Sequence, residues 1–305
     1  MQGRVIKSTG SWYNVVDKND KQYSCRLRGK FKISGIKVTN PIAVGDYVEF
    51  ELEKEDVGLI INILPRENYV IRKSIKSAKE GHILAANIDQ AVLIVTLTKP
   101  RTSLGFIDRF LVTAEAFRIP AILIFNKSDL YDDELLESQK ELSKIYEALG
   151  YQTLLVSAFN EQDQQIFYDL LKNKTSLISG HSGVGKSTLI NKIAPEINQK
   201  TQEVSSFANK GVHTTTFAEM FKIDRNSYVI DSPGIKELGI LDIEKEELSH
   251  FFPEMRALLG KCKFHNCMHL QEPKCAVIQA IEQGNIALSR YESYMSILEN
   301  EDNRR

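Results

Sequence analysis

The sequence predicts an α/β protein in three parts: an N-terminal β-barrel, a central doubly wound parallel sheet and a helical C-terminal region. The first part holds five short runs rich in β-branched and aromatic residues, and from about residue 88 short apolar runs alternate with helical stretches. Beyond about residue 238 the chain turns polar and helical, and three of its four cysteines fall within 14 residues. We therefore expect domains at residues 1–67, 72–238 and 239–305.

The barrel is predicted from short runs that Gly, Asn, Asp and Pro separate. The runs are Arg4–Ile6, Tyr13–Val16, Gln22–Leu27, Tyr47–Leu52 and Gly58–Ile63. Five short strands in so short a segment fit a closed OB-fold, which often binds nucleic acid. An SH3-like barrel has nearly the same pattern, and the sequence leaves that alternative open.

The central sheet is predicted from continuous apolar runs, which are typical of strands buried on both faces. These runs are Ala91–Thr96, Ala121–Phe125, Thr153–Val156 and Ser176–Ile178, with two more near 217–223 and 228–230. Helical stretches at Ile107–Phe117 and Glu134–Leu149 lie between them, as in a parallel sheet covered on both sides. A further helical tail is expected over Ala276–Leu298.

Composition narrows the class of protein. A hydrophobic content of 42% excludes a disordered chain, and a net charge of −1 gives no global reason to expect a nucleic-acid or membrane partner. No apolar run approaches the roughly 20 residues that span a bilayer, and the first residues lack an apolar signal core. We expect a cytoplasmic protein without a membrane partner.

A phosphate-binding loop is the sharpest motif in the sequence. It matches G-x-x-x-x-G-K-[ST] between an apolar strand and a helical segment, and its residues are Gly180, His181, Ser182, Gly183, Val184, Gly185, Lys186 and Ser187, followed by Thr188. Glycines let successive backbone N–H groups face phosphate oxygens at a helix N-terminus. Lys186 is expected to reach the β- and γ-phosphates as a catalytic group, and Ser187 to ligate Mg²⁺.

Base selection is predicted for the segment Asn126, Lys127, Ser128 and Asp129, which follows an apolar strand. The Asp129 carboxylate can accept hydrogen bonds from guanine N1–H and the exocyclic amine, and adenine cannot offer this pair of donors. Asn126 is expected to hold neighbouring loops together, while the Lys127 stem covers the base. Ser157 and Ala158, after the next strand, complete the expected pocket through backbone N–H groups.

Groups for the γ-phosphate are predicted downstream. Asp231 opens D-S-P-G and is placed to hold Mg²⁺ through water, while the Gly234 N–H can meet the γ-phosphate. Thr215, within a run of three threonines, is the expected second Mg²⁺ ligand. Position 235 holds isoleucine, which cannot orient a water molecule, so His213 is the candidate catalytic group. A solvent-exposed switch histidine is the alternative that the sequence leaves open.

The order of these motifs along the chain is rotated. An ordinary GTPase carries its phosphate loop first and N-K-x-D near the end, whereas here N-K-S-D precedes the phosphate loop. A doubly wound sheet tolerates such a circular permutation because packing and ladder hydrogen bonds hold it together. D-S-P-G then leads directly into the C-terminal region, and we expect the nucleotide state to reposition that region.

A structural zinc site is predicted at Cys262, Cys267, His269 and Cys275. Three thiolates and one imidazole complete a tetrahedron, so no position remains for catalytic water. His265 is a competing ligand, and a set of reduced buried cysteines is the alternative. Cys25 stands apart and is expected to pack inside the barrel.

An RNA-binding edge is predicted on the barrel. Residues 1–40 hold nine Lys or Arg and two Asp or Glu, whereas residues 41–67 hold two and seven. The basic run 26–32, with Lys37 beyond it, suits docking onto RNA phosphates, and Phe31 is available to stack on a base. A solvated, charged strand face is the alternative.

Taken together, the motifs resemble those of the bacterial ribosome small-subunit-dependent GTPase A family, RsgA, over nearly the whole chain. Val212 departs from the family, which has a basic residue before the histidine. The resemblance implies a GTPase of late small-subunit maturation that uses GTP, Mg²⁺ and one structural Zn²⁺. It also implies stimulation by the 30S subunit, rRNA binding near the decoding region, release of another assembly factor and a monomer away from the ribosome.

Two other functions stay open at this level. One is a metabolic P-loop enzyme such as a small-molecule kinase, against which N-K-S-D argues. The other is an RNA-binding scaffold whose nucleotide is structural and is never hydrolysed.

Overall fold

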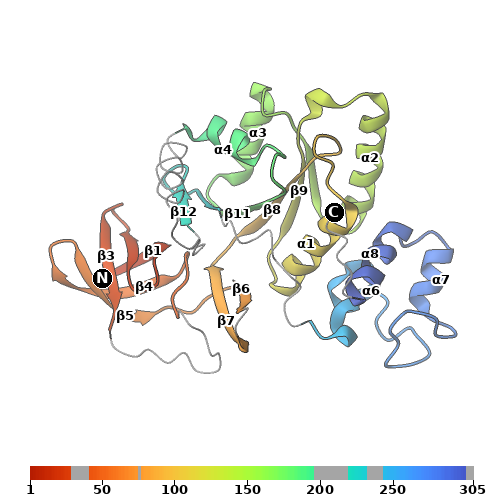
Figure 1. Ribbon diagram of the computed structural model, residues 1–305, viewed down its shortest axis with the longest axis horizontal. Helices are drawn as coiled ribbons and strands as arrows, with labels where there is room; N and C mark the ends of the chain where they lie inside the picture. The colour runs from red at the N-terminus through yellow and green to blue at the C-terminus, as the bar shows by residue number, and fades with distance from the viewer. Residues whose placement is uncertain (29–40, 75–76, 196–218, 232–242, 300–305) are drawn as a thin grey trace. The chain divides into compact units, whose positions relative to one another are not determined.

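The computed structural model describes residues 1–28, 41–74, 77–195, 219–231 and 243–299, without the side chains of residues 72–82 and 231. Two compact units emerge from its contacts (Figure 1). The first comprises Met1–Val92, Ala158–Gly180 and Gly185–Glu237, and the second comprises Leu93–Ser157, His181–Val184 and Leu238–Arg305. Each unit is described by itself below.

A closed five-stranded barrel begins the first unit. Its strands are β1 (Gln2–Ser8), β2 (Tyr13–Asp17), β3 (Gln22–Leu27), β4 (Tyr47–Lys54) and β5 (Val57–Ile63). They pair in the order β1-β2-β3-β5-β4, and β4 returns to β1. Because alternate side chains point inward, Val5, Val15, Cys25, Phe50 and Ile60 form a core with no exposed surface. The OB-like barrel is confirmed, and Cys25 packs inside it as expected.

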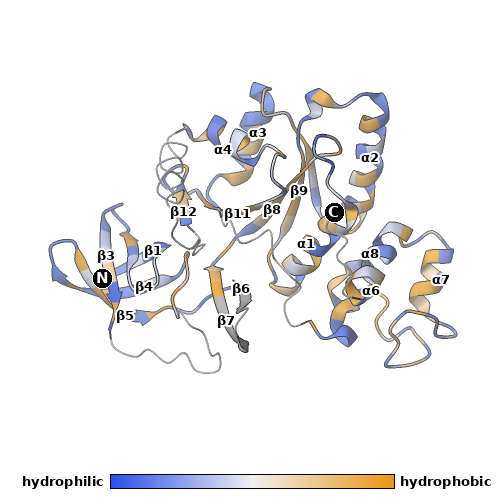
Figure 2. Cartoon of the chain, in the orientation of Figure 1, coloured by the Kyte–Doolittle hydropathy of each residue, from blue (hydrophilic) through white to orange (hydrophobic). Residues whose placement is uncertain are grey.

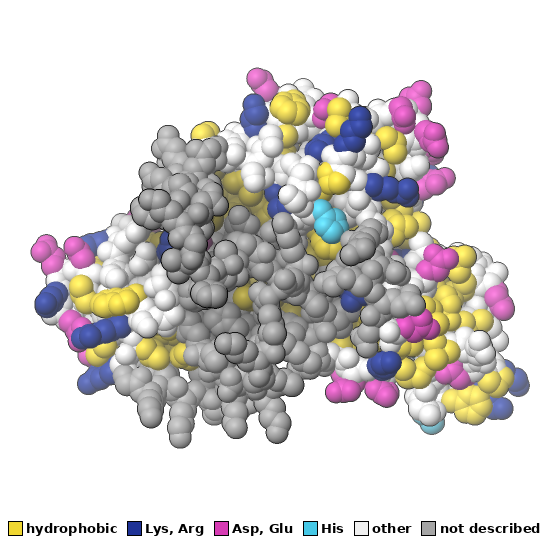
Figure 3. All heavy atoms as spheres, viewed as in Figure 1, with side chains coloured by type: hydrophobic (Ala, Val, Ile, Leu, Met, Phe, Trp, Pro, Cys, Tyr) yellow, Lys and Arg dark blue, Asp and Glu magenta, His cyan; other side chains and the backbone are white. Residues whose placement is uncertain are grey.

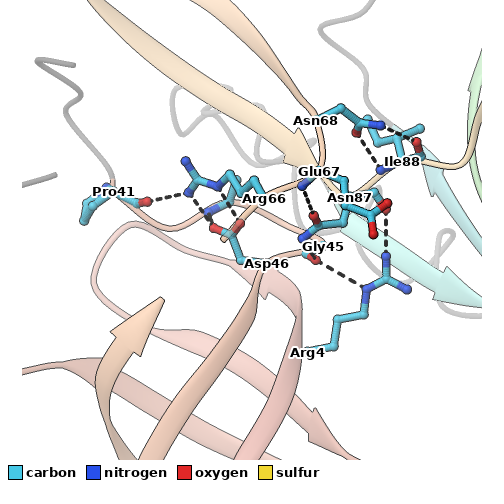
Figure 4. Close-up of polar contacts among 10 residues, drawn as sticks. Arg4, Pro41, Gly45, Asp46, Arg66, Glu67, Asn68, Asn87 and Ile88 are labelled. Atoms are coloured by element: carbon cyan, nitrogen blue, oxygen red, sulfur yellow. Dashed lines mark hydrogen bonds and ion pairs between the residues drawn. The ribbon is translucent and has the colours of Figure 1, made fainter. Parts of the chain in front are cut away.

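The sequence interpretation missed a hairpin, β6 (Tyr69–Ser74) and β7 (Ser77–Ala86), that follows the barrel. A buried ion pair fixes the chain just before it: Arg66 Nε lies 2.6 Å from Asp46 Oδ1, and Arg66 also donates to the Pro41 carbonyl (Figure 4). At the far end, the Asn87 side chain bonds the Gly45 carbonyl. These contacts hold the barrel and hairpin together within the first unit.

The first unit also contains three strands of the central sheet. In it, β11 (Thr175–Ser179) runs parallel to β13 (Tyr228–Asp231), which pairs antiparallel with β12 (Glu219–Lys222). Two helices, α3 (Glu161–Leu171) and α4 (Lys186–Ile193), belong to the same unit. Every residue of β11 is buried, as expected for a strand that is covered on both faces.

The second unit also contains strands of a parallel sheet. Its strands are β8 (Gln90–Val95, which begins in the first unit), β9 (Ala121–Phe125) and β10 (Gln152–Leu155), in the order β10-β9-β8. Helix α1 (Leu104–Ala116), the short η1 (Ser128–Leu130) and α2 (Asp133–Ala148) connect them. β8 and β9 are buried throughout, and their ribbons are largely orange in Figure 2. The predicted α/β sheet is confirmed.

The C-terminal region of the second unit is helical. It comprises η3 (Lys245–Phe251), α6 (Pro253–Arg256), α7 (Ala276–Glu282) and α8 (Leu288–Leu298). The helical tail expected over 276–298 is made of two helices, α7 and α8, because the chain turns at Gly284, whose φ of +73° favours glycine. Among the described residues, no helix has both the length and the apolarity to cross a membrane.

Candidate functional site

The phosphate loop follows the buried strand β11. Gly180, Gly183 and Gly185 have φ values of +145°, +86° and +95°, a region that favours glycine. Helix α4 then begins at Lys186, and no described side chain caps it. The Lys186 ammonium donates to the Gly180 carbonyl at 2.6 Å. The loop thus carries a cation over its own backbone at a helix N-terminus, an arrangement that suits an anion.

The pairing of β11 with β13 places Asp231 next to the start of the phosphate loop, within the first unit. Asp231 is paired with Ile178, two residues before Gly180. Since the carboxyl ends of parallel strands meet at one edge, D-S-P-G begins where the phosphate loop begins. Ser187 and Thr188 are exposed in the first turn of α4, so their hydroxyl groups are accessible.

The N-K-S-D segment contacts Val184, which lies in the part of the phosphate loop (His181–Val184) that belongs to the second unit. Asn126 is 1% exposed, and its Nδ2 donates to the Val184 carbonyl at 2.8 Å. Val184 is itself fully buried. A single buried hydrogen bond thereby joins two motifs that are 58 residues apart in the chain. The Oδ1 atom of Asn126 is buried and has no hydrogen-bond partner among the described residues, which leaves an acceptor for a ligand donor.

Asp129 and Ser157 lie together after β9 and β10. The two strands are parallel, with Phe125 opposite Leu155, so the loops that follow them meet. Ser157 Oγ donates to Asp129 Oδ1 at 2.5 Å, while the rest of Asp129 is exposed. The Gln164 side-chain amide donates a hydrogen bond to the Ala158 carbonyl at 2.9 Å.

Lys127 lies over the loop that follows β8. Its backbone φ is +65°, and its ammonium donates to the Lys99 carbonyl at 2.6 Å. Tyr131 supports the same region, because its hydroxyl donates to the Asn126 carbonyl and accepts the Leu97 N–H. Sequence reasoning missed Tyr131, since no motif marks it.

Three predicted site residues lie outside the described residues: His213, Thr215 and Gly234. The side chain of Asp231 also lies outside them. Their predicted roles remain predictions.

The Cys/His cluster brings its four predicted ligands together. The ligand atoms of Cys262, Cys267, His269 and Cys275 lie within 4.8 Å of one another, with Cys262 Sγ 4.0 Å from Cys275 Sγ. Tetrahedral Zn²⁺ with Zn–S bonds of about 2.3 Å needs sulfur separations of about 3.8 Å, so the donor set fits zinc. His265 is exposed and lies outside the cluster, which removes it as the competing ligand.

Burial shifts the pKa values of two of these ligands. It lowers the pKa of His269, which favours the neutral imidazole that binds metal. It raises the pKa of Cys267 to about 12, so this thiol stays protonated until a cation stabilises the thiolate.

Side chains around the cluster shape the ligand loop, and sequence reasoning missed them. The Glu272 carboxylate accepts the Met268 N–H at 2.7 Å and the Leu270 N–H at 2.8 Å. The Tyr291 hydroxyl donates to the His269 carbonyl at 2.8 Å. These bonds hold His269 at a φ of +59°, a conformation that non-glycine residues rarely adopt.

The basic run on the barrel is largely neutralised where it is described. Arg26 lies 2.9 Å from Glu53, and Arg28 lies 3.6 Å from Glu51. Figure 3 accordingly shows Lys and Arg side chains beside Asp and Glu side chains over the barrel. The basic and acidic segments therefore do not form separate edges among these residues, because the closed barrel brings β3 and β4 to the same face. The rest of the run, with Phe31 and Lys37, lies outside the described residues.

Comparison with known proteins gives full-length matches. A family model described as RsgA GTPase matches residues 63–241, and one described as RsgA N-terminal domain matches residues 2–60. The chain is 53% identical over 307 residues to the small ribosomal subunit biogenesis GTPase RsgA of Cytophaga hutchinsonii, with 100% of each chain covered. The crystal structure of YjeQ from Thermotoga maritima matches with a TM-score of 0.78 at 37% identity, covering 100% of this chain and 99% of that one. YloQ, a circularly permuted GTPase, matches with a TM-score of 0.74 at 33% identity, covering 100% and 96%.

Proposed function

Because the chain belongs to the RsgA GTPase family, we propose that it hydrolyses GTP to GDP and phosphate during late maturation of the small ribosomal subunit. Family membership confirms two predictions made from the residues, the GTPase activity and the permuted order of the motifs. The same membership supports a cytoplasmic site of action.

One observation carries the nucleotide site: the buried hydrogen bond from Asn126 to the Val184 carbonyl. Without it, N-K-S-D and G-x-x-x-x-G-K-S would be two separate matches in the sequence. With it, the base-reading segment and the part of the phosphate loop from His181 to Val184 belong to one arrangement inside the second unit. A small-molecule kinase has no need of such a guanine-reading segment.

In this proposal, the base is held by Asp129, Lys127 and the Ser157–Ala158 backbone. Asp129 accepts two hydrogen bonds from guanine, and Ser157 fixes the orientation of its carboxylate. The phosphates lie on the N–H groups of residues 180–188, where Lys186 neutralises charge that develops in the transition state.

Magnesium would be held by Ser187 and Thr215, with Asp231 acting through water, and it would supply charge neutralisation at the β- and γ-phosphates. The Gly234 N–H would meet the γ-phosphate, and His213 would orient the attacking water. The zinc held by Cys262, Cys267, His269 and Cys275 would be structural, since no ligand position is left for water.

The proposed partners are the small ribosomal subunit and its rRNA near the decoding region. Stimulation of hydrolysis by the subunit, release of another assembly factor and a monomeric state away from the ribosome complete the proposal. Trp12, which is 43% exposed in the turn after β1, offers an aromatic ring to RNA.

Nucleotide choice is the direct test of the site. Competition against a fluorescent GDP analogue should show displacement by GTP and not by ATP. Asp129→Asn should abolish this preference, because it replaces one of the two accepting carboxylate oxygens by an NH2 group, which can only donate. Asp133→Asn, the same change on the exposed first turn of α2, should leave the preference intact. A wild-type chain that prefers ATP would overturn the proposal.

Phosphate release with and without small ribosomal subunits tests the reaction. We expect slow release by the protein alone and faster release with the subunits. Nucleotide binding with no release under either condition would favour the scaffold function instead.

A further inference from the structure

Helix α1 is held from two opposite sides near its N-terminus. Phe106 stacks on His181 of the phosphate loop, with ring centroids 3.9 Å apart and an interplanar angle of 30°. Asp108 lies two residues further along the same helix. Residues two apart on a helix point to nearly opposite faces, so Phe106 and Asp108 face different neighbours.

Asp108 receives a charged partner from the C-terminal region. Arg290 of α8 lies 2.6 Å from Asp108, and both side chains are 1% exposed. Arg290 Nε also donates to Glu254 at 2.7 Å, and its guanidinium lies 4.7 Å from the centre of the Phe252 ring. The C-terminal region is therefore docked on α1 through a buried cation with two carboxylate partners.

Disrupting the contact between the C-terminal region and α1 costs folding free energy. The Tyr146 hydroxyl of α2 donates to Asp108 at 3.0 Å, so two helices, α2 and α8, converge on one carboxylate of α1. Burial raises the pKa of Asp108 while the Arg290 charge opposes that rise. Removing one partner of such a pair leaves an uncompensated charge in the interior, so the pair holds a single geometry rather than several.

We propose that Asp108 and Arg290 are positioning residues for the phosphate loop: docking of the C-terminal region on α1 and nucleotide binding at residues 180–188 are coupled through the first turns of that helix. The inference rests on the proposed function for its ligand. It gives the C-terminal region a route to the nucleotide that differs from the covalent path through D-S-P-G. By linkage, each event must then strengthen the other by the same factor.

The test measures both directions in the full-length zinc-bound protein. Asp108→Asn keeps the shape of the side chain and removes its charge. We expect it to raise the Kd for a fluorescent GDP analogue by about 5- to 150-fold, the range usual for coupled sites. In the wild type, GDP should slow hydrogen exchange over residues 288–298, and Asp108→Asn should lose this protection.

Arg256→Met is the matched control. Arg256 also joins the C-terminal region to α1, through Glu115 at 2.8 Å, but this pair is exposed and lies at the other end of the helix. Its Kd for GDP should stay within twofold of the wild type. Arg290→Lys keeps a cation and should give a smaller loss of affinity than Asp108→Asn, which a purely structural defect would not predict.

Two outcomes would overturn the inference. One is a wild-type protein whose exchange over 288–298 is the same with and without GDP. The other is a folded Asp108→Asn variant with unchanged GDP affinity. Either result is compatible with normal guanine binding and would leave the proposed function unchanged. A wild-type chain that binds no guanine nucleotide would instead contradict the proposed function itself.

Discussion

Replacing Asn126 by alanine tests the hydrogen bond to Val184 from which the nucleotide site is proposed. Asn126 Nδ2 and the Val184 carbonyl are 2.8 Å apart, and both residues are buried. Alanine removes the donor and leaves the carbonyl without its partner in the phosphate loop. Water cannot readily replace the donor, because Val184 has no exposed surface.

The expected loss of GDP affinity follows from the burial of both the donor and the acceptor. A buried acceptor left unsatisfied costs about 1–3 kcal/mol. If the loop keeps its nucleotide-binding conformation only when that bond is made, the same energy is lost from nucleotide binding. Since about 1.4 kcal/mol is a factor of ten, GDP should bind about 5- to 150-fold more weakly.

Fluorescence titration with a GDP analogue provides the measurement, and circular dichroism checks that the variant is folded. Asn62→Ala is the matched control, because Asn62 is exposed on the barrel and its side chain donates to Glu49 of the neighbouring strand. It should bind GDP as the wild type does. A folded Asn126→Ala protein with wild-type affinity would refute the reasoning, since the bond would then contribute nothing to the site.

Three further predictions concern the metal, the barrel and its cysteine. Cys275→Ser should lower the zinc content from one ion per chain toward none, measured by atomic absorption after dialysis against a chelator; retention of a full ion would rule out the four-ligand site. Arg66→Met should lower the free energy of unfolding by about 3–5 kcal/mol in urea, because it strands Asp46 at 0% exposure; an unchanged midpoint would contradict this. Burial raises the pKa of Cys25 to about 11, so its thiolate is scarce at pH 8 and iodoacetamide should label it only after denaturation; labelling of the native protein at the rate of a free thiol would be the contrary result.

The sequence predicted elements best where composition and period agree. The predicted bounds of β3 and β9 match the structure because both are compact runs between clear turn residues. β6 and β7 were missed because Lys, Glu, Gly and Ala interrupt their apolar pattern. The turn at Gly284 was missed because apolar residues continue at helical spacing on both sides of it.

The residues of the candidate site also differ in how well the sequence predicts them. Motifs with fixed local spacing, such as the phosphate loop and the four metal ligands, were visible in the sequence. The contacts of Glu272 and of Arg290 were not, because neither residue belongs to a motif and Arg290 meets a partner 182 residues away. The neutralised charges of Arg26 and Arg28 were also invisible, since only strand order places β3 near the acidic β4.

The permuted order has a physical consequence for the C-terminal region. The proposed nucleotide site uses contacts between loops, such as Asn126 with Val184 and Asp129 with Ser157, and such contacts do not depend on which loop comes first in the chain. What the order does change is the element that follows D-S-P-G, which here is the region carrying the zinc ligands. That region is covalently continuous with D-S-P-G at one end, and Arg290 docks it on α1 near the other. Under the proposed coupling, a change at the γ-phosphate that reached the zinc-binding region would have to move that region against α1, and therefore against the buried Asp108–Arg290 pair.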